Sequence, residues 1–425
     1  MSRPIRLMTL APGHFHAALV LKEMPPEIYR RTYVYAPLDG DLVEYLASVA
    51  AFNNRADNPT HWQIDVRAGA DYLDRFLREQ PGHAVVISGR NRPKIDLILA
   101  AVSNSCHVLA DKPWVIDSEG FEKLAEVFRQ ADLRDVLAWD MMTERFDIAT
   151  ILQRDLIQDA EVFGEPISGT AHDPALTLDA THYLYKTVAG KPLRRPAWWF
   201  DPDEAGMGLV DTGTHLADLS IWLLFPDQAV DHRADLEMLD ARIWPTPITR
   251  EQYRIIADAP DSVDELLLYQ GNGSATYRLR GSAVRFTVNW DFESAGHGDR
   301  HEVIARGGRS RIRVRSTAGH NELSVIANEP ADHTRLLDAV GRRCGEWQLR
   351  HPGVAAVDLG DRIQIAIPDR YRTDHEQHFA DVLDEFLRNV RNPRRAAPWE
   401  IPNLLTKYAI TTRAVELART KQARG

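Results

Sequence analysis

The sequence of 425 residues has little cysteine, holding only Cys106 and Cys344. Two cysteines are too few for a disulfide framework or a cysteine-rich zinc site, which suits a reducing compartment. The sequence also lacks an apolar run of about 18 residues, the length that a membrane span needs, and its first residues lack the apolar stretch of a signal peptide. We therefore expect a cytoplasmic protein without a membrane partner.

Basic residues are in deficit, since 51 lysines and arginines face 61 acidic residues and the formal net charge is −10. A general attraction to nucleic acid or to an anionic membrane surface is therefore not expected. The hydrophobic share of 44% is that of an ordinary globular protein. At about 150 residues per domain the length indicates two or three domains, and two is the simpler choice, with a small molecule as ligand.

Short apolar runs alternate with amphipathic segments over residues 1–145, the pattern of βαβ units around a parallel sheet. The predicted strands are Ile5–Leu10, Thr32–Ala36, Trp62–Val66, Ala84–Ser88, His107–Ala110 and Val136–Trp139. Helical periodicity predicts helices at Ala17–Met24, Asp71–Arg78, Lys94–Asn104 and Glu119–Gln130. This part is predicted to be α/β, a doubly wound parallel sheet of the Rossmann, dinucleotide-binding type.

The pattern changes in residues 146–425, which we expect to form an α+β domain for substrate binding and oligomerisation. Alternating residues predict a largely antiparallel open sheet with one half-buried face. Its predicted elements are a helix at Asp147–Gln158, strands at Glu265–Tyr269, Ser274–Arg280 and Val284–Trp290, and closing helices at Asp374–Val390 and Pro402–Lys421. The loop that begins at Asn392 separates these last two helices.

The turn after the first strand is poor in glycine, because Gly13 is the only glycine where a G-x-G-x-x-G fingerprint has three. Backbone N–H groups of Gly13, His14 and Phe15 at the start of a helix are still candidates for contact with a cofactor phosphate. The alternative is a plain strand-to-helix turn.

Two further loops at the carboxyl edge of the predicted sheet carry candidate cofactor contacts. Asp39 follows the second strand, where an acid holds the adenosine ribose 2′-hydroxyl, and therefore favours NAD over NADP, which stays possible. The alternative for Asp39 is an aspartate in a turn before Gly40. Arg90 and Asn91 follow the fourth strand and are candidate cofactor contacts as well.

Two segments carry candidate catalytic residues. Lys112 follows a short apolar strand and precedes a proline that stiffens the turn, so that its ammonium is suited to polarise a substrate oxygen, although an ordinary surface lysine is the alternative. Asp211, His215 and Asp218 are spaced i, i+4 and i+7, so one helix would present them on one face. The alternative there is a capped helix with a hydrogen-bonded core histidine.

A loop rich in aromatic and basic residues precedes that helix, and such side chains stack on sugar C–H faces and bind hydroxyls. Its candidate substrate-binding residues are His182, Tyr183, Lys186, Trp198 and Trp199. A packed loop between domains is the alternative. The segment His375-Glu-Gln-His378 has the spacing H-E-x-H, without the H-E-x-x-H of a zinc motif or a third ligand, and no metal site is expected.

Two motifs in this order resemble the Gfo/Idh/MocA oxidoreductases. Asp111-Lys112-Pro113 is similar to the family's E-K-P with Asp in place of Glu, and residues 206–218 look like its glycine-rich D-x-G-x-H-x-x-D helix. The start Ala-Pro-Gly-His-Phe-His resembles a subgroup with a distinctive C-terminal domain. Departures are His14 and His16, where small residues are usual, and Lys94, where a histidine is common.

The resemblance implies hydride transfer between a carbinol carbon and nicotinamide C4, with Lys112, Asp211 and His215 as the catalytic group. In these roles His215 moves the hydroxyl proton, Lys112 stabilises the developing oxyanion, and Asp211 orients the substrate or the imidazole. Asp218 is expected to contact these catalytic residues rather than the substrate.

We therefore expect an NAD(P)-dependent oxidoreductase acting on a ring hydroxyl or ketone of a sugar, glycoside or polyol, as a homodimer or homotetramer. One alternative is a glycoside lyase or hydrolase that oxidises its substrate transiently with bound NAD. Another is a nucleotide-binding protein without catalysis, which the reduced glycine turn favours and the three catalytic candidates oppose.

Overall fold

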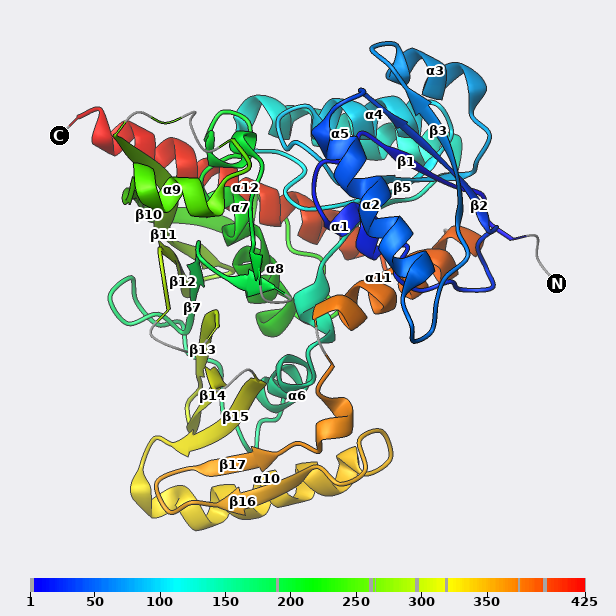
Figure 1. Ribbon diagram of the computed structural model, residues 1–425. Coiled ribbons are helices and arrows are strands. Elements are labelled where there is room, and N and C mark those ends of the chain that lie inside the picture. The colour runs from blue at the N-terminus through cyan, green and yellow to red at the C-terminus, as the bar shows by residue number, and fades with distance from the viewer. Residues whose placement is uncertain are drawn as a thin grey trace. The chain divides into compact units, whose positions relative to one another are not determined.

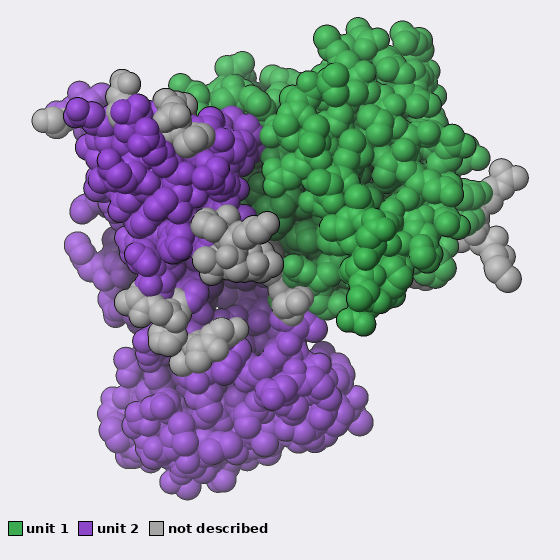
Figure 2. Space-filling model, in the orientation of Figure 1, with its two compact units in different colours: residues 1–143, 201–206, 375–401 green, residues 144–200, 207–374, 402–425 purple. Residues whose placement is uncertain are grey.

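The computed structural model describes residues 4–188, 191–259, 263, 265–294, 298–317, 320–373, 375–392 and 396–424. Figure 1 traces the chain by residue number, and Figure 2 shows the two compact units into which it divides. Unit 1 comprises residues 1–143, 201–206 and 375–401, and unit 2 comprises residues 144–200, 207–374 and 402–425. The chain first passes from unit 1 to unit 2 after residue 143, next to the boundary expected after residue 145. Two later segments, residues 201–206 and 375–401, belong to unit 1 again.

Unit 1 contains a six-stranded parallel sheet in the order β3-β2-β1-β4-β5-β6. Its strands are β1 (Leu7–Leu10), β2 (Arg31–Ala36), β3 (Gln63–Ala68), β4 (Ala84–Ile87), β5 (His107–Ala110) and β6 (Ala138–Asp140). The strands β1 and β4 are buried at every position, as the apolar runs predict. The prediction of a doubly wound Rossmann sheet is confirmed.

The helices of unit 1 are α1 (His16–Leu19), α2 (Gly40–Asn54), α3 (Tyr72–Glu79), α4 (Lys94–Ser103), α5 (Ser118–Arg134) and α11 (His375–Arg391). Helix α1 is a single turn, shorter than the predicted Ala17–Met24. Pro25 excludes the predicted end of this helix at Met24, because the residue before a proline avoids the helical conformation. Helix α11 packs against α1, and the rings of His16 and Phe379 lie 4.4 Å apart. Residue 374, the predicted start of α11, lies outside the described residues.

Unit 2 is built on a nine-stranded sheet in the order β10-β11-β12-β7-β13-β14-β15-β17-β16. Its strands are β7 (Leu176–Tyr183), β10 (Leu236–Thr249), β11 (Leu266–Leu279), β12 (Ser282–Asp291), β13 (Arg300–Arg306), β14 (Ser310–Thr317), β15 (His320–Ala327), β16 (Ala355–Asp358) and β17 (Ile363–Ala366). Neighbouring strands run antiparallel except for β7 and β12, which are parallel. The predicted largely antiparallel sheet is confirmed, and a hairpin of β8 (Thr187–Val188) and β9 (Lys191–Pro192) stands apart from it.

The helices of unit 2 are α6 (Ile148–Ile157), α7 (Gly208–Asp211), α8 (Gly213–Leu224), α9 (Arg250–Ile256), α10 (His333–Trp347) and α12 (Glu400–Gln422), whose first two residues belong to unit 1. Asp147 caps α6 by accepting a hydrogen bond from the Thr150 N–H, as the sequence pattern indicates. Among the described helices, none is long and apolar enough to cross a membrane.

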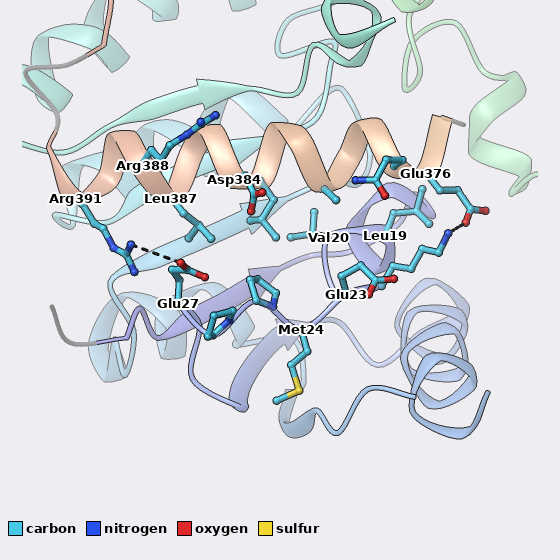
Figure 3. Close-up of a pocket in the computed structure, with 16 residues that line it drawn as sticks. Leu19, Val20, Glu23, Met24, Glu27, Glu376, Asp384, Leu387, Arg388 and Arg391 are labelled. Atoms are coloured by element: carbon cyan, nitrogen blue, oxygen red, sulfur yellow. Dashed lines mark hydrogen bonds and ion pairs between the residues drawn. The ribbon is translucent and has the colours of Figure 1, made fainter. Parts of the chain in front are cut away.

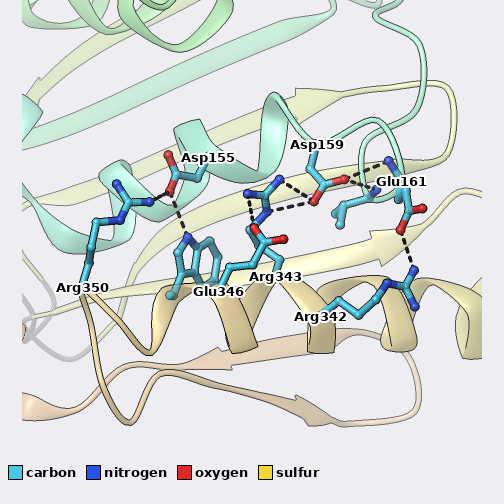
Figure 4. A network of polar contacts seen from close by, with 9 residues as sticks. Asp155, Asp159, Glu161, Arg342, Arg343, Glu346 and Arg350 are labelled. Atoms are coloured by element: carbon cyan, nitrogen blue, oxygen red, sulfur yellow. Dashed lines mark hydrogen bonds and ion pairs between the residues drawn. The ribbon is translucent and has the colours of Figure 1, made fainter.

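Charged pairs join α10 to α6 and the turn after it (Figure 4). Asp155 accepts from the Trp347 indole and from Arg350, and Asp159 pairs with Arg343 at 2.8 Å. These partly exposed contacts are each worth about 0–1 kcal/mol. They orient α10, while its buried residues supply the packing against the sheet.

Candidate active site

The sheet of unit 1 has a small pocket at its carboxyl edge, where the strand order reverses between β1 and β4. Its volume is about 80 Å³, and it is lined by Ala11, Pro12, Pro37, Asp39, Asp41, Tyr72, Ile87, Gly89, Arg90, Pro93 and Leu97. Open α/β sheets bind their ligands at such a reversal. Asp39 also caps α2 by accepting from the Leu42 N–H, which is a structural role of the kind considered as its alternative. Arg90 lies 3.7 Å from Asp41.

The turn after β1 is tightly packed against the loop after β4. A Cβ added to Gly89 would lie 2.2 Å from the Ala11 carbonyl oxygen, so this glycine permits the close approach. The N–H groups of Gly13 and His14 both donate to the Ser88 carbonyl, at 3.0 and 3.2 Å. Two of the backbone donors that were expected to face a phosphate are therefore engaged within the protein, and α1 behind them is only one turn long.

Phe15 and Asn91 have contrasting environments. Phe15 is 53% exposed, and its ring contacts those of His14 and His16. Asn91 is buried, donates to the Ala205 carbonyl and accepts from Lys94 at 2.7 Å. The amide of Asn91 therefore holds residues 201–206 against the loop after β4, which is a positioning role.

Asp111, at the end of β5, collects several polar contacts on its Oδ2 atom. His16 Nδ1 lies 3.1 Å away, His14 Nδ1 3.4 Å and the Ser88 hydroxyl, which donates, 3.0 Å. Burial alone would raise the pKa of Asp111, but His16, Lys94 and His14 hold it well below its usual range. Asp111 is therefore an ionised carboxylate within the sheet edge.

Lys112 follows Asp111 on a turn whose conformation is held by buried neighbouring residues. The Lys112–Pro113 peptide bond is cis. Trp114 is fully buried, donates to the Ala110 carbonyl and stacks on Phe128. The half-buried Lys112 is therefore held between an anchored carboxylate and an anchored indole.

In unit 2, Asp211 and His215 belong to two consecutive helices, α7 and α8, rather than to the one helix that was predicted. The helix is interrupted at Thr212, where the His215 N–H donates to the Thr212 carbonyl three residues back. Thr212 keeps helical angles, φ −75° and ψ −36°, so the chain continues in nearly the same direction. Both side chains are half-buried.

Two glycines of the motif let these helices lie directly on the sheet. A Cβ on Gly208 would come within 1.7 Å of the Gly271 carbonyl oxygen in β11. A Cβ on Gly213 would come within 3.1 Å of the Phe286 ring in β12. The glycine-rich pattern of the sequence is thus explained by close packing of helix on sheet, which brings Asp211 toward β11.

Asp218 lies deeper in α8 and forms a buried cluster with two cations. Arg145 donates to both of its oxygens at 2.7 Å, and Lys407 of α12 donates to Oδ1 at 3.3 Å. The side chains of Asp218 and Lys407 are 3% and 1% exposed. Burial would raise the pKa of Asp218, but the two cations lower it below its usual range. Its carboxylate ties α8 to α12.

Aromatic rings gather around Trp290, at the end of β12. His182 stacks on Trp290 with ring centroids 4.8 Å apart, and Trp199 meets it edge-on at 5.1 Å. Trp199 in turn stacks on Tyr269 at 4.9 Å. The Trp290 indole donates to the Thr212 hydroxyl, which ties this cluster to the junction of α7 and α8.

Ionic groups border the aromatic rings. His182 and Lys186 both donate to Asp299 Oδ2, at 2.8 and 2.5 Å, while His182 Nε2 has no hydrogen-bond partner among the described residues. Burial would raise the pKa of Asp299, but His182 and Lys186 lower it strongly. The Arg195 guanidinium lies over Trp199 and Trp290, with centroid distances of 4.8 and 5.5 Å.

Tyr269 extends this cluster toward the helix that carries Asp211. Burial and the charge of Asp211 raise the pKa of the Tyr269 phenol well above its usual value, although Arg195 opposes this. A neutral phenol beside a carboxylate is suited to donate a hydrogen bond.

The structure thus brings together three of the five predicted substrate residues, His182, Lys186 and Trp199. Tyr183 is buried, and its carbonyl accepts from Arg195, which makes it part of the support. Trp198 is buried in the same short 3₁₀ turn as Trp199. Sequence reasoning did not select Tyr269, Trp290, Asp299 or Arg195 as site residues. Only the aromatic end of the alternating segment 282–290 hinted at one of them.

A second cavity lies on unit 1 along α11 (Figure 3). It has a volume of about 530 Å³ and is bounded by α11 and residues 19–27. Its ends are closed by ion pairs, one between Lys22 and Glu376 and one between Arg391 and Glu27 at 3.8 Å. Glu376 of the H-E-x-H segment therefore forms an ion pair at one end of this cavity.

Comparison with known proteins agrees with the two units. Residues 152–419 match the family described as "Putative oxidoreductase C terminal domain". A "putative oxidoreductase" of known structure from Parabacteroides merdae is 36% identical over 99% of both chains, with a TM-score of 0.95. No curated protein sequence matches the chain.

Two more distant structures share the fold. A levoglucosan dehydrogenase in complex with NADH is 12% identical over 99% of this chain and 98% of its own, with a TM-score of 0.63. KijD10, a 3-ketoreductase from Actinomadura kijaniata in complex with TDP-benzene and NADP, is 15% identical over 98% of both chains, with a TM-score of 0.58.

The parallel sheet of unit 1, the matched C-terminal unit and the similarity over the full length define an oxidoreductase. Within that class, the chain belongs to the Gfo/Idh/MocA family, as the motifs around Lys112 and Asp211 indicate.

Proposed function

We propose that the protein is an NAD(P)-dependent dehydrogenase or ketoreductase acting on a ring hydroxyl or ketone of a sugar, glycoside or polyol. The observation that carries this proposal is the pocket at the reversal of strand order in unit 1, with Asp39 in its wall. Two fold relatives, the levoglucosan dehydrogenase and KijD10, are complexes with NADH and NADP.

The residues of unit 1 fit the adenosine half of such a cofactor. Asp39 is the residue that we expect to hold the ribose 2′-hydroxyl, and Arg90 lines the same pocket. Asp39 favours NAD, because an acid at this position repels a 2′-phosphate. Since the Gly13 and His14 amides donate to Ser88, we expect the backbone of this turn to contribute less to binding the phosphates than that of a glycine-rich turn.

The catalytic roles fall to Lys112, Asp211 and His215. A bound nicotinamide supplies a hydride acceptor or donor at its C4 atom. Lys112, fixed after β5, stabilises the negative charge that develops on the substrate oxygen. His215 takes the hydroxyl proton during oxidation and returns it during reduction. Asp211 orients the substrate or the imidazole, and it lies on α7 directly over β11.

The aromatic cluster around Trp290 supports the proposed substrate class. The rings of His182, Trp199 and Tyr269 give flat apolar faces for sugar C–H groups, while Lys186 and Arg195 supply hydrogen-bond donors at their border. We therefore expect a pyranoside or a related polyol.

The test measures cofactor binding and turnover separately. Calorimetry of the purified protein with NAD and NADP gives the two dissociation constants, and NADH absorbance is then followed against a panel of glycosides and polyols. Lys112→Met should lower kcat by about 100- to 1,000-fold, the effect of removing one oxyanion donor. Lys123→Met is the matched control, because Lys123 pairs with Asp96 on the exposed face of α5.

Each result has a definite meaning. Binding of NAD with Lys112-dependent NADH formation supports the dehydrogenase. Binding of NAD with conversion of a glycoside but no net NADH would replace it by the lyase or hydrolase that oxidises transiently. Failure to bind either nucleotide would refute the proposal.

A further inference from the structure

Three side chains with metal-ligating atoms meet at the carboxyl edge of the sheet of unit 1. His14 and His16 come from the turn after β1, and Asp111 comes from the end of β5. Their ligand atoms all lie within 4.8 Å of one another, in the only such group of three among the described residues. A turn and a strand end 95 positions apart are thus brought to one point.

Two of the three distances fit the edges of a coordination tetrahedron. Zinc binds histidine nitrogen and carboxylate oxygen at about 2.0–2.1 Å, which places two ligands of a tetrahedral site about 3.3–3.4 Å apart. The His16 and His14 Nδ1 atoms lie 3.1 and 3.4 Å from the same Asp111 Oδ2. The third edge, between His14 and His16, is bounded by the 4.8 Å that spans all three ligand atoms, so one ion would draw the two imidazoles toward each other.

Hydrogen bonding alone accounts poorly for this geometry. The Asp111 Oδ2 atom accepts from Ser88 at 3.0 Å and faces both imidazoles, so three groups compete for two lone pairs. The His14 contact at 3.4 Å is long for a charge-assisted hydrogen bond, which is usually about 2.7–2.9 Å. A cation would use the nitrogen lone pairs and the carboxylate together, and Ser88 would then orient the carboxylate from outside.

We propose that His14, His16 and Asp111 form a binding site for one divalent cation of the zinc type. Two imidazoles and one carboxylate are ligands that Zn²⁺ and Co²⁺ accept. Three protein ligands leave a fourth position for water or a substrate oxygen, as in catalytic zinc sites. The open side lies by His14, whose side chain is 26% exposed, against 9% for His16 and 4% for Asp111.

The neighbouring charge limits the affinity of this site. Lys94 is fully buried beside it, donates to Asn91, and its charge acts on both Asp111 and His14. A positive neighbour opposes a second cation. Lys94→Met, which removes that charge and keeps most of the volume, should therefore bind the metal more tightly, an effect that a hydrogen-bonded cluster without a metal would not produce.

The experiment uses the full-length protein, treated with chelator and free of nucleotide. Zn²⁺ binding is measured by calorimetry, and Co²⁺ is used as the spectroscopic probe, since tetrahedral coordination gives strong visible absorption. We expect one ion per chain. The loss of a residue that only hydrogen-bonds to a metal ligand weakens metal binding by about 10- to 100-fold. His14→Ala, His16→Ala and Asp111→Asn should each weaken it by more than this.

His61→Ala and His172→Ala, at exposed positions, are the matched controls and should keep the affinity of the unchanged protein. His14→Ala is the variant that decides if the more buried His16→Ala or Asp111→Asn unfolds, which circular dichroism would reveal. An absence of stoichiometric Zn²⁺ and Co²⁺ binding, or binding that all three ligand variants retain, would overturn the proposal. The outcome does not depend on the proposed function, which is judged by nucleotide binding and turnover.

Discussion

The buried cluster around Asp218 makes an asymmetric prediction about stability. Asp218→Asn keeps the shape of the side chain but leaves Lys407, 1% exposed, and Arg145 without the carboxylate that they share. Lys407→Met instead removes one cation and leaves the two-point contact between Arg145 and Asp218 intact, with both bonds at 2.7 Å. The two changes remove the same Lys407–Asp218 contact and differ in the charge that stays buried.

The expected magnitudes follow from this difference. Removing one partner of a buried ionic cluster costs about 3–5 kcal/mol, whereas replacing a charge by an apolar side chain of similar volume is often neutral or stabilising. Asp218→Asn should therefore lower the free energy of unfolding by about 3–5 kcal/mol, and Lys407→Met should change it by less than about 1.5 kcal/mol. At about 2–4 °C per kcal/mol, the first change lowers the melting temperature by roughly 6–20 °C.

Urea unfolding at pH 7, followed by fluorescence and by circular dichroism, measures both variants against the unchanged protein. Coincident curves from the two probes show that the free energies can be compared. The reasoning is refuted if Lys407→Met destabilises as much as Asp218→Asn, or if Asp218→Asn costs less than 1 kcal/mol.

Three other predictions concern acid stability, close packing and substrate binding. Because the folded-state pKa of Asp218 is lowered, its ionised form contributes stability above the unfolded value of about 3.9 and loses it as the pH falls through the folded pKa. The gap in unfolding free energy between the protein and Asp218→Asn should therefore narrow from pH 7 to pH 3, and a constant gap would contradict this. Gly208→Ala should cost more than about 3 kcal/mol in urea unfolding, because its Cβ would lie 1.7 Å from the Gly271 oxygen. Gly341→Ala, on open helix surface, should stabilise by about 0.5–1 kcal/mol and serves as control. Asp299→Asn should raise KM for the sugar by about 10- to 100-fold, through loss of the charged contacts that fix two side chains beside Trp290, and leave the nucleotide Kd unchanged. An equal loss of nucleotide affinity would count against that assignment.

The strands of unit 1 followed directly from the sequence, because buried parallel strands leave uninterrupted apolar runs, whereas helix α2 was not among the predicted helices. The six predicted strands correspond to β1–β6. Helix α1 was overextended, because the pattern from Ala17 is apolar enough for a longer helix, and the effect of the Pro25-Pro26 pair was not considered. The interruption at Thr212 was not predictable either, since an i+3 hydrogen bond has no sequence signature there.

Candidate site residues could be selected from the sequence where a motif places them close together, as for Lys112 and for Asp211 with His215. It was missed where distant segments supply the contacts. Asp299 meets His182 over 117 positions, and no local pattern indicates that pairing. The cluster of His14, His16 and Asp111 was not predicted for the same reason. Two histidines in a turn do not indicate a metal site until the fold is known to place the Asp111 carboxylate beside them.

The return of α11 to unit 1 has a consequence for how the chain is made. During synthesis, residues 1–143 emerge from the ribosome well before α11, because residues 144–374 have to be synthesised in between. At about 5–20 residues per second this interval lasts roughly 10–50 seconds. During that time the apolar surface around Leu19 and Val20 lacks the helix that covers it in the finished protein. A chain that ends before α11 is therefore expected to leave this apolar surface uncovered.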